Sequence, residues 1–388
     1  MRSLIARCGA SSAQKLELGL LDAGWSPEPL DEGIDFDSAR NRDIARRMAE
    51  SSIVLLENST GLLPLQTPQR IAIVGPCADD AQTFFGCYAF PNHVIPMYPD
   101  FDGGIGIVAD SLLSAMRLEF GSAEVDYAPG CPVSGGDLSG LDAAVDAAAA
   151  ADVVVLGRGD RAGIFGAGTS GEGCDAEDLN LPGHQPELVE AILRDRATDR
   201  AAWWCREGRT HSGSIRAARS AIMQAFFPGE EGGSALAGCA IWSGQSLGQA
   251  AGGGSPPCGC PAPHVPGAAA GAGQPRVSSN LDPTPAFPFG HGLSYTSFGY
   301  ENLRTSAVEI DTAGSVELTV IVCNTGARGG DEVVQLYASD PVATVTRPVT
   351  QLIGFARVRL DAGESAEVSL HCALRPFVVY RADPGTDR

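Results

Sequence analysis

A glutamate enclosed by two glycines is the residue of this sequence best suited to proton-transfer chemistry. Glu172 lies in the segment Ser170–Asp175, which reads Ser-Gly-Glu-Gly-Cys-Asp. A carboxyl group can protonate a departing oxygen and afterwards activate water, and flanking glycines let a backbone adopt unusual angles close to another domain. Glu177 and Asp178 are rival carboxyl groups nearby. Taken alone, the segment is more simply explained as an exposed loop with an ordinary glutamate.

Two further positions could contact a ligand or order the site. Tyr88 closes the run Phe84–Tyr88, Phe-Phe-Gly-Cys-Tyr; its ring could stack on a ligand, although core packing is the simpler interpretation. Asp160 and Arg161 precede the Glu172 segment and could order it, with a surface ion pair as an equal alternative. His291 lies in a Phe-Gly-His-Gly turn, and we expect it to be structural and to bond backbone groups of that turn.

Nucleotide and zinc chemistry lack their motifs. Gly75–Ala78 reads Gly-Pro-Cys-Ala, which is no glycine-rich phosphate fingerprint, and there is no Gly-Lys-Ser/Thr loop. Cys258 and Cys260 lack a second pair of ligands at metal spacing. We therefore expect no cofactor and no metal.

The composition indicates a folded, acidic protein. Of 388 residues, 44% are hydrophobic and 19% charged, and the formal net charge is −20. Such a surface repels nucleic acid and anionic membrane and suits neutral partners such as sugars. No apolar run is long enough to span a membrane, and the N-terminus lacks the pattern of a secretory signal. The 11 cysteines match no disulfide framework, so we expect a cytoplasmic protein.

Helical and strand patterns alternate up to about residue 193. Apolar residues three and four apart from Asn41 predict a helix that ends near residues 57–58. Ile71–Val74 predicts a buried strand before Gly75. Further helices are expected over 108–120, 141–151 and 186–193, and further strands over 123–127 and 153–156. This alternation predicts a layered α/β domain with a largely parallel sheet.

After Asp282 the pattern changes to strands alone. They are expected over 315–323, 332–338, 349–358 and 366–371, separated by turn-forming residues. The spacing is typical of a small all-β sandwich. The residues available for one core face are spaced by two: Val316, Leu318, Val320, Val334, Leu336, Val368 and Leu370. The predicted organisation is a linker over 1–40, an α/β domain over 41–286 and a β-sandwich over 287–388.

Four segments, taken together and in this order, resemble glycoside hydrolase family 3. Ala49–Asn58 is similar to the entry of the family's second domain, and Ser170–Asp175 to its Ser-Gly-Glu-Gly loop. Ala225–Gly233, Ala-Phe-Phe-Pro-Gly-Glu-Glu-Gly-Gly, is the third segment. Phe287–Tyr295 resembles the opening of the family's fibronectin type III-like domain. The fold implied is an α/β sandwich domain followed by an all-β fibronectin type III-like sandwich.

The resemblance implies a retaining β-glycosidase of the β-glucosidase or β-xylosidase type, acting on a β-linked oligosaccharide or glycoside. Retention requires two carboxyl groups about 5–5.5 Å apart, one attacking and the other transferring protons. Glu172 matches the family's acid/base, and Tyr88 lies in a loop similar to one that approaches the sugar. The family usually has arginine after the position of Asp175, where this sequence has Ala176.

The family's nucleophile is an aspartate on an N-terminal barrel of about 250 residues. Here only about 40 residues precede the second domain, and residues 1–40 are interpreted as a linker with the end of the barrel. No aspartate of this sequence takes the nucleophile role, so we expect the isolated chain to be inactive and a separately encoded barrel to be its partner. The alternatives are a non-catalytic carbohydrate-binding or interaction module and a decayed gene product. Glucose, xylose and arabinose remain equal candidates for the sugar.

Two stretches, residues 195–215 and 239–275, fit neither the helical nor the strand pattern. The resemblance calls for a buried strand after the helix ending near residue 193, but the sequence there is Arg-Asp-Arg-Ala-Thr-Asp-Arg. Burying these charges at a sheet centre would cost much desolvation energy. We hypothesise that both stretches are translated out of frame, with a linker or divergent insertion as the alternative. The sheet would then lack a central strand and expose unpaired edges.

Overall fold

The computed structural model of the chain describes residues 12–25, 35–66, 68–98, 100–176, 178, 180–194, 201–205, 221–241, 287–311, 314–339 and 350–373. The chain divides into two compact units, residues 1–43 and 44–388. The second unit contains both the α/β domain and the C-terminal β-domain. None of the described helices is long and apolar enough to cross a membrane.

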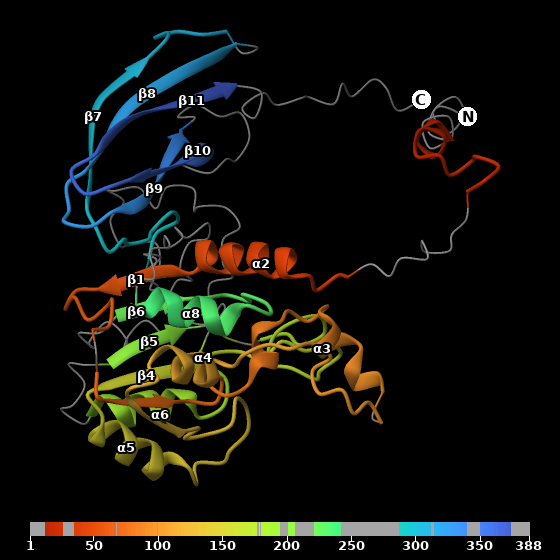
Figure 1. Cartoon of the computed structure of the whole chain (residues 1–388), viewed down its shortest axis with the longest axis vertical. Helices are drawn as coiled ribbons and strands as arrows, with labels where there is room; N and C mark the ends of the chain where they lie inside the picture. Colours follow the sequence, from red (N-terminus) through yellow and green to blue (C-terminus); the bar gives the residue numbers. More distant parts are fainter. Residues whose placement is uncertain are drawn as a thin grey trace, which may run out of the picture. The chain divides into compact units, whose positions relative to one another are not determined.

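A six-stranded sheet forms the centre of the α/β domain, in the order β1-β6-β5-β4-β2-β3 (Figure 1). Its strands are β1 (Val54–Asn58), β2 (Arg70–Val74), β3 (Glu124–Ala128), β4 (Val153–Arg158), β5 (Ala201–Cys205) and β6 (Ala221–Gln224). Neighbouring strands run parallel, except that β1 pairs antiparallel with β6. The predicted largely parallel α/β sheet is confirmed.

Helices cover both faces of this sheet because successive strand residues point to opposite faces. Ile71 and Ile73 belong to the core that contains α4 (Leu112–Glu119) and α8 (Gly232–Ile241). Ala72 and Val74 belong to the core that contains α5 (Leu141–Ala150) and α6 (Gln185–Arg194). The remaining helices are α2 (Ala39–Ser52), η1 (Ala81–Phe84), α3 (Phe90–His93) and η2 (Ile95–Met97).

Two expected helix boundaries are wrong. The helix from Asn41 does not continue to residues 57–58; it ends at Ser52, and β1 follows. Val54 and Leu55 lie in the cores on opposite sides of the sheet, so strand pairing overrides the helical spacing. The helix expected from residue 108 begins at Leu112, because the Ser111 hydroxyl caps it by accepting a bond from the Ser114 N–H at 3.1 Å.

The expected loss of a central strand is also wrong. Residues 201–205 form β5, which pairs in parallel with β4 on one side and β6 on the other. The outer edge of β1 is met by Leu293, whose N–H donates to the carbonyl of Leu55 at 2.8 Å. Apart from β5 and the end of α8, the stretches 195–215 and 239–275 lie outside the described residues. The out-of-frame hypothesis itself stays a prediction.

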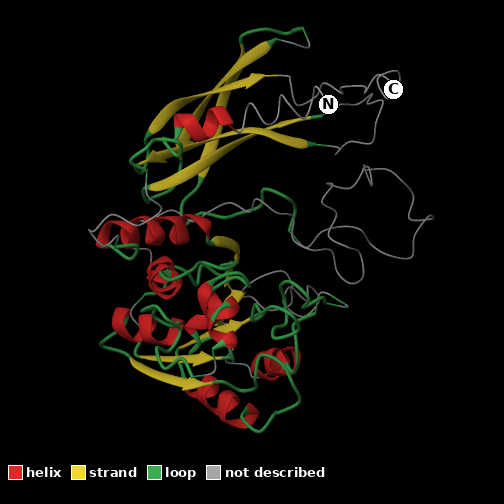
Figure 2. Cartoon of the chain, turned by 90° about the vertical axis from the view of Figure 1, so that its right-hand side faces the viewer, coloured by secondary structure: helices red, strands yellow, loops and turns green. Residues whose placement is uncertain are grey.

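The C-terminal domain consists of antiparallel strands in two sheets (Figure 2). One sheet has the order β11-β8-β7 and the other pairs β10 with β9. Its core contains Val320, Val334 and Val368, as predicted, together with Val322 and Leu360, and Leu370 packs against it. The other residues predicted for this face are only half-buried: Val316, Leu318 and Leu336. The strands are β7 (Phe298–Thr305), β8 (Ser315–Asn324), β9 (Gly330–Ala338), β10 (Gln351–Leu360) and β11 (Ser365–Ala373). The predicted all-β sandwich is confirmed, and β7 is a strand that the sequence patterns did not indicate.

His291 joins the two domains of the second unit. Its Nε2 lies 2.8 Å from the carbonyl oxygen of Leu56 in β1, and its ring lies 5.0 Å from that of Phe287. Tyr295 adds a bond from its hydroxyl to the Cys239 carbonyl in α8, at 2.8 Å. His291 is therefore structural, as predicted: its backbone N–H donates to the Pro288 carbonyl of its own turn at 3.0 Å, and its ring also bonds a strand of the α/β domain.

Candidate active site

Two loops leave the sheet at the carboxyl ends of β2 and β4, which are adjacent parallel strands. From β2 the chain passes to β3 on one side, and from β3 it crosses back to β4 on the other side. The strand order therefore reverses at β2 and β4. In open α/β sheets, ligands bind outside the carboxyl ends of the strands at such a switch point. The loop after β2 carries Tyr88 and the loop after β4 carries Glu172.

The loop after β4 folds back on itself and leaves Glu172 exposed. The N–H of Gly163 donates to the carbonyl of Ser170 at 2.9 Å, and the N–H of Phe165 donates to the carbonyl of Glu172 at 2.8 Å. Gly171 has a φ of +120°, and a Cβ there would lie 2.2 Å from the carbonyl oxygen of Gly163. Only glycine fits this position, so the glycine before Glu172 is required by the fold of the loop.

Tyr88 reaches across from the other loop to Glu172. Its hydroxyl donates a hydrogen bond to Oε2 of Glu172, a residue 84 positions further along the chain. Its side chain is 65% exposed, so the interpretation of Tyr88 as a core residue is wrong. The hydrogen bond to Glu172, and then the charge of that carboxylate, raise the pKa of the Tyr88 phenol. The structure thus brings together the two site residues that the sequence indicates.

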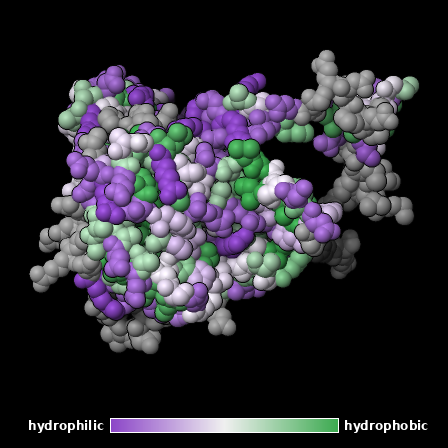
Figure 3. Space-filling view, turned by 60° about the horizontal axis from the view of Figure 1, so that its bottom comes forward, coloured by the Kyte–Doolittle hydropathy of each residue, from purple (hydrophilic) through white to green (hydrophobic). Residues whose placement is uncertain are grey.

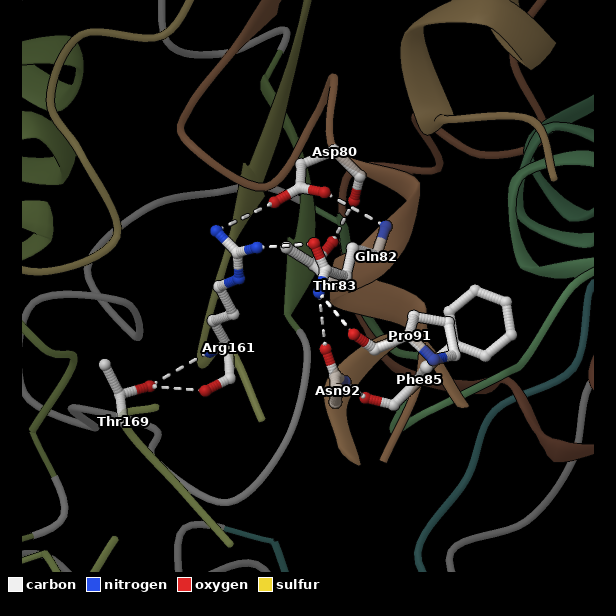
Figure 4. A network of polar contacts seen from close by, with 8 residues as sticks. All are labelled: Asp80, Gln82, Thr83, Phe85, Pro91, Asn92, Arg161 and Thr169. Atoms are coloured by element: carbon white, nitrogen blue, oxygen red, sulfur yellow. Dashed lines mark hydrogen bonds and ion pairs between the residues drawn. The ribbon is translucent and has the colours of Figure 1, made fainter. Parts of the chain in front are cut away.

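Arg161 also ties the same two loops together, through Gln82 and Asp80 of the loop after β2 (Figure 4). Its guanidinium donates to Oε1 of Gln82 and lies 3.7 Å from a carboxylate oxygen of Asp80. Gln82 in turn donates to Oδ1 of Asn92 at 3.0 Å, and Asn92 donates to the carbonyl of Phe85 at 2.7 Å. Arg161 therefore orders the loops instead of forming an isolated surface pair. Sequence reasoning missed Gln82 and Asn92, because nothing local marks them as partners of the loop after β4.

Buried polar groups fix the start of the loop after β4. Asp160 is 1% exposed and accepts a bond from the Thr169 hydroxyl at 2.8 Å. Gln185 is fully buried; its Oε1 accepts from the Gly159 N–H at 2.9 Å. Its Nε2 donates to the carbonyls of Gly159 at 2.8 Å and Val133 at 3.0 Å. Gln185 is also the first residue of α6, one position before the start of the helix expected over 186–193.

A cleft of about 630 Å³ lies between this loop and the start of α6. The rival carboxyl group Asp178 lines it, and so does Ala176, where the family usually has arginine; Glu177 lies outside the described residues. A hydrogen bond from His184 lowers the pKa of Glu187, which also lines the cleft. The other lining residues are Gly168, Thr169, Asp175, Asn180, Leu181, Pro182, Gly183 and Pro186. Within the described residues, no cluster of His, Cys, Asp and Glu is placed to hold a metal ion.

Phe165 is a further residue of the site that sequence reasoning missed. Its side chain is 70% exposed, and its φ of 54° is left-handed, which is uncommon for a residue with a large side chain. The adjoining Gly166 and the bond to the Glu172 carbonyl hold it there.

Figure 3 shows that hydrophobic groups on one face of the molecule occur in small patches among hydrophilic ones.

Comparison with known proteins identifies the family of this fold and site. Residues 53–295 match the glycosyl hydrolase family 3 C-terminal domain, and residues 332–386 match the fibronectin type III-like domain. A β-xylosidase of Formosa agariphila is 33% identical over 386 residues, which cover 96% of this chain and 51% of that protein. A periplasmic β-glucosidase of Salmonella typhimurium is 27% identical over 96% of this chain and 51% of its own length.

Solved structures agree with this result. A β-glucosidase from Erythrobacter marinus has a TM-score of 0.67 at 30% identity, over 87% of this chain and 46% of that one. A β-glucosidase from Listeria innocua in complex with isofagomine has a TM-score of 0.72 over 95% of this chain and 50% of that one; at 23% identity it shows the fold alone. The chain spans about half the length of the curated relatives it matches. It belongs to glycoside hydrolase family 3, and it carries the family's C-terminal α/β domain followed by the fibronectin type III-like domain.

Proposed function

We propose that this chain supplies the acid/base side of a retaining, exo-acting β-glycosidase, a β-glucosidase or β-xylosidase that hydrolyses O-glycosidic bonds. The observation that carries the proposal is the placement of Glu172. It is exposed on an ordered loop at the switch point of the sheet, and Tyr88 bonds its carboxylate. The relatives named β-xylosidase and β-glucosidase support the substrate class.

The reaction proceeds in two steps with Glu172 acting in both. In the first, the Glu172 carboxyl gives its proton to the glycosidic oxygen while a second carboxylate attacks the anomeric carbon and the glycosidic bond breaks. In the second, the Glu172 carboxylate takes a proton from water, whose oxygen displaces that second carboxylate from the sugar. We assign the second carboxylate to a barrel domain outside this sequence, because no residue of the loops around Glu172 matches the family's nucleophile.

An assay with and without the barrel tests this function. The isolated chain should hydrolyse nitrophenyl β-glucoside and nitrophenyl β-xyloside no faster than buffer, and adding or fusing a family 3 barrel should restore turnover. In the assembled enzyme, Glu172→Gln should abolish turnover, while the matched control Glu301→Gln, at an exposed carboxylate of β7, should retain it. Turnover by the isolated chain that disappears in Glu172→Gln would place the nucleophile within this sequence. Full activity of the assembled Glu172→Gln variant would remove Glu172 from the acid/base role.

The second candidate is a non-catalytic carbohydrate-binding module. The exposure of two aromatic side chains beside the site favours it, Tyr88 at 65% and Phe165 at 70%, since exposed rings can stack on sugar faces. Titration calorimetry of the isolated chain with glucose, xylose and their β-linked disaccharides separates the two functions. Binding without the barrel, weakened in Tyr88→Ala and Phe165→Ala, would favour the binding module.

A further inference from the structure

The contact between Tyr88 and Glu172 engages only one oxygen of the carboxylate. The Tyr88 hydroxyl donates to Oε2, and Glu172 is exposed. An exposed glutamate otherwise samples several rotamers. A donor that engages one oxygen fixes the side chain and decides which oxygen remains available for proton transfer.

The backbone on both sides of this contact is held in place. The Glu172 carbonyl accepts from the Phe165 N–H at 2.8 Å. A Cβ added to Gly171 would lie 2.7 Å from the Cβ of Cys87, so the loop with Glu172 rests directly on the residue before Tyr88. The Tyr88 ring meets the His93 ring edge-on at 5.8 Å. Both partners therefore reach the contact from ordered segments.

We propose that Tyr88 is a positioning residue for the acid/base Glu172, and not a sugar-stacking ligand; this inference rests on the function proposed above. The phenol anchors Oε2, so Oε1 holds the proton that passes to the glycosidic oxygen and later receives one from water. Tyr88 itself neither gains nor loses a proton in either step. Its hydroxyl donates the same hydrogen bond throughout, which keeps Oε1 in one orientation.

The full chain alone permits the first test. With tyrosine ¹³C-labelled at Cζ, the Tyr88 resonance is identified by its absence in Tyr88→Phe, and its pKa is measured by NMR. The pKa should lie above the ordinary value in the native chain and fall in Glu172→Gln, where the carboxylate charge is gone. Asp178→Asn is the matched control and should leave it unchanged. A Tyr88 pKa that is the same in the native chain and in Glu172→Gln would overturn the proposal.

The chain assembled with a barrel permits the second test, which separates positioning from stacking. Tyr88→Phe keeps the ring but lacks the donor, so kcat should fall roughly 10- to 100-fold, as expected for losing one hydrogen bond to a charged group, with KM within about twofold. Tyr88→Leu should show the same fall in kcat and the same small change in KM. If Tyr88→Phe keeps the native kcat and only Tyr88→Leu raises KM, stacking is correct and positioning is refuted. If no barrel restores turnover, the function proposed above fails, and the NMR titration alone decides whether Tyr88 holds Glu172.

Discussion

Replacing Gln185 by alanine should destabilise the α/β domain by about 3–4 kcal/mol, because this buried side chain bonds the start of the loop that carries Glu172. Gln185 is fully buried and makes hydrogen bonds to Gly159 and Val133 at 2.8 to 3.0 Å. Each bond contributes about 0.5–1.5 kcal/mol, and each buried group left unpaired costs about 1–3 kcal/mol. Three bonds are lost together, so the effect should exceed that of an average point substitution.

Urea unfolding followed by circular dichroism measures this loss. The neighbouring His184→Ala is the matched control, because the His184 side chain is part-exposed and bonds the exposed Glu187 side chain, at 3.0 Å. It should change the unfolding free energy by less than about 0.5 kcal/mol. A Gln185→Ala variant within about 1 kcal/mol of the native chain would refute the reasoning, since the bonds around Gly159 would then not hold the loop.

Three further predictions concern the loop, alkaline stability and the C-terminal domain. Gly171→Ala should destabilise the chain more than Gly166→Ala in thermal unfolding. Both glycines have positive φ, but a Cβ at Gly171 would lie 2.2 Å from a carbonyl oxygen whereas Gly166 faces open space; equal effects would contradict this. Burial, followed by the charge of Asp79, raises the pKa of Tyr127 to about 12. An unfolded tyrosine ionises near pH 10, so the contribution of Tyr127 to the free energy of unfolding should be fully present below pH 10 and should decline as pH rises towards 12. The urea midpoint should therefore fall between pH 8 and pH 11, and it should fall less in Tyr127→Phe. Residues 296–388 have a core of their own and should melt cooperatively with a β-type spectrum when expressed alone, and a disordered spectrum would contradict that.

Sequence alone predicts the elements whose signal is local. The run Ile71–Val74 and the strands around Val320, Val334 and Val368 are confirmed because alternation or a short apolar run specifies a buried strand. Val54–Asn58 is different. Its apolar residues continue the spacing of the preceding helix, and only pairing with β6, more than 160 residues later, makes it a strand. No pattern within the segment carries that information.

In the candidate site too, the local sequence marks one residue, Glu172, but does not reveal the role of the other, Tyr88. Glu172 is marked by its glycines, and the structure explains one of them through the contact of Gly171 with Gly163. Tyr88 follows the buried Phe84 in an apolar run and therefore looks like a core residue, but it is exposed. Its role depends on two loops that meet because β2 and β4 are neighbours at the switch point. That adjacency is a property of the sheet order and is absent from either loop's sequence.

The polar bonds beneath Glu172 bear on how a complete active site would form. Arg161 bonds Gln82, and Gln185 bonds Gly159, so the loop after β4 is fixed from within the α/β domain. Glu172, the proposed acid/base, is therefore ordered before any second carboxylate approaches. A barrel that contributes the nucleophile would need to bring one carboxylate to about 5–5.5 Å from Glu172, without reorganising the loop. Because the loop with Glu172 is already ordered, binding of the barrel need not supply free energy to order it. That free energy can instead orient the sugar between the two carboxylates.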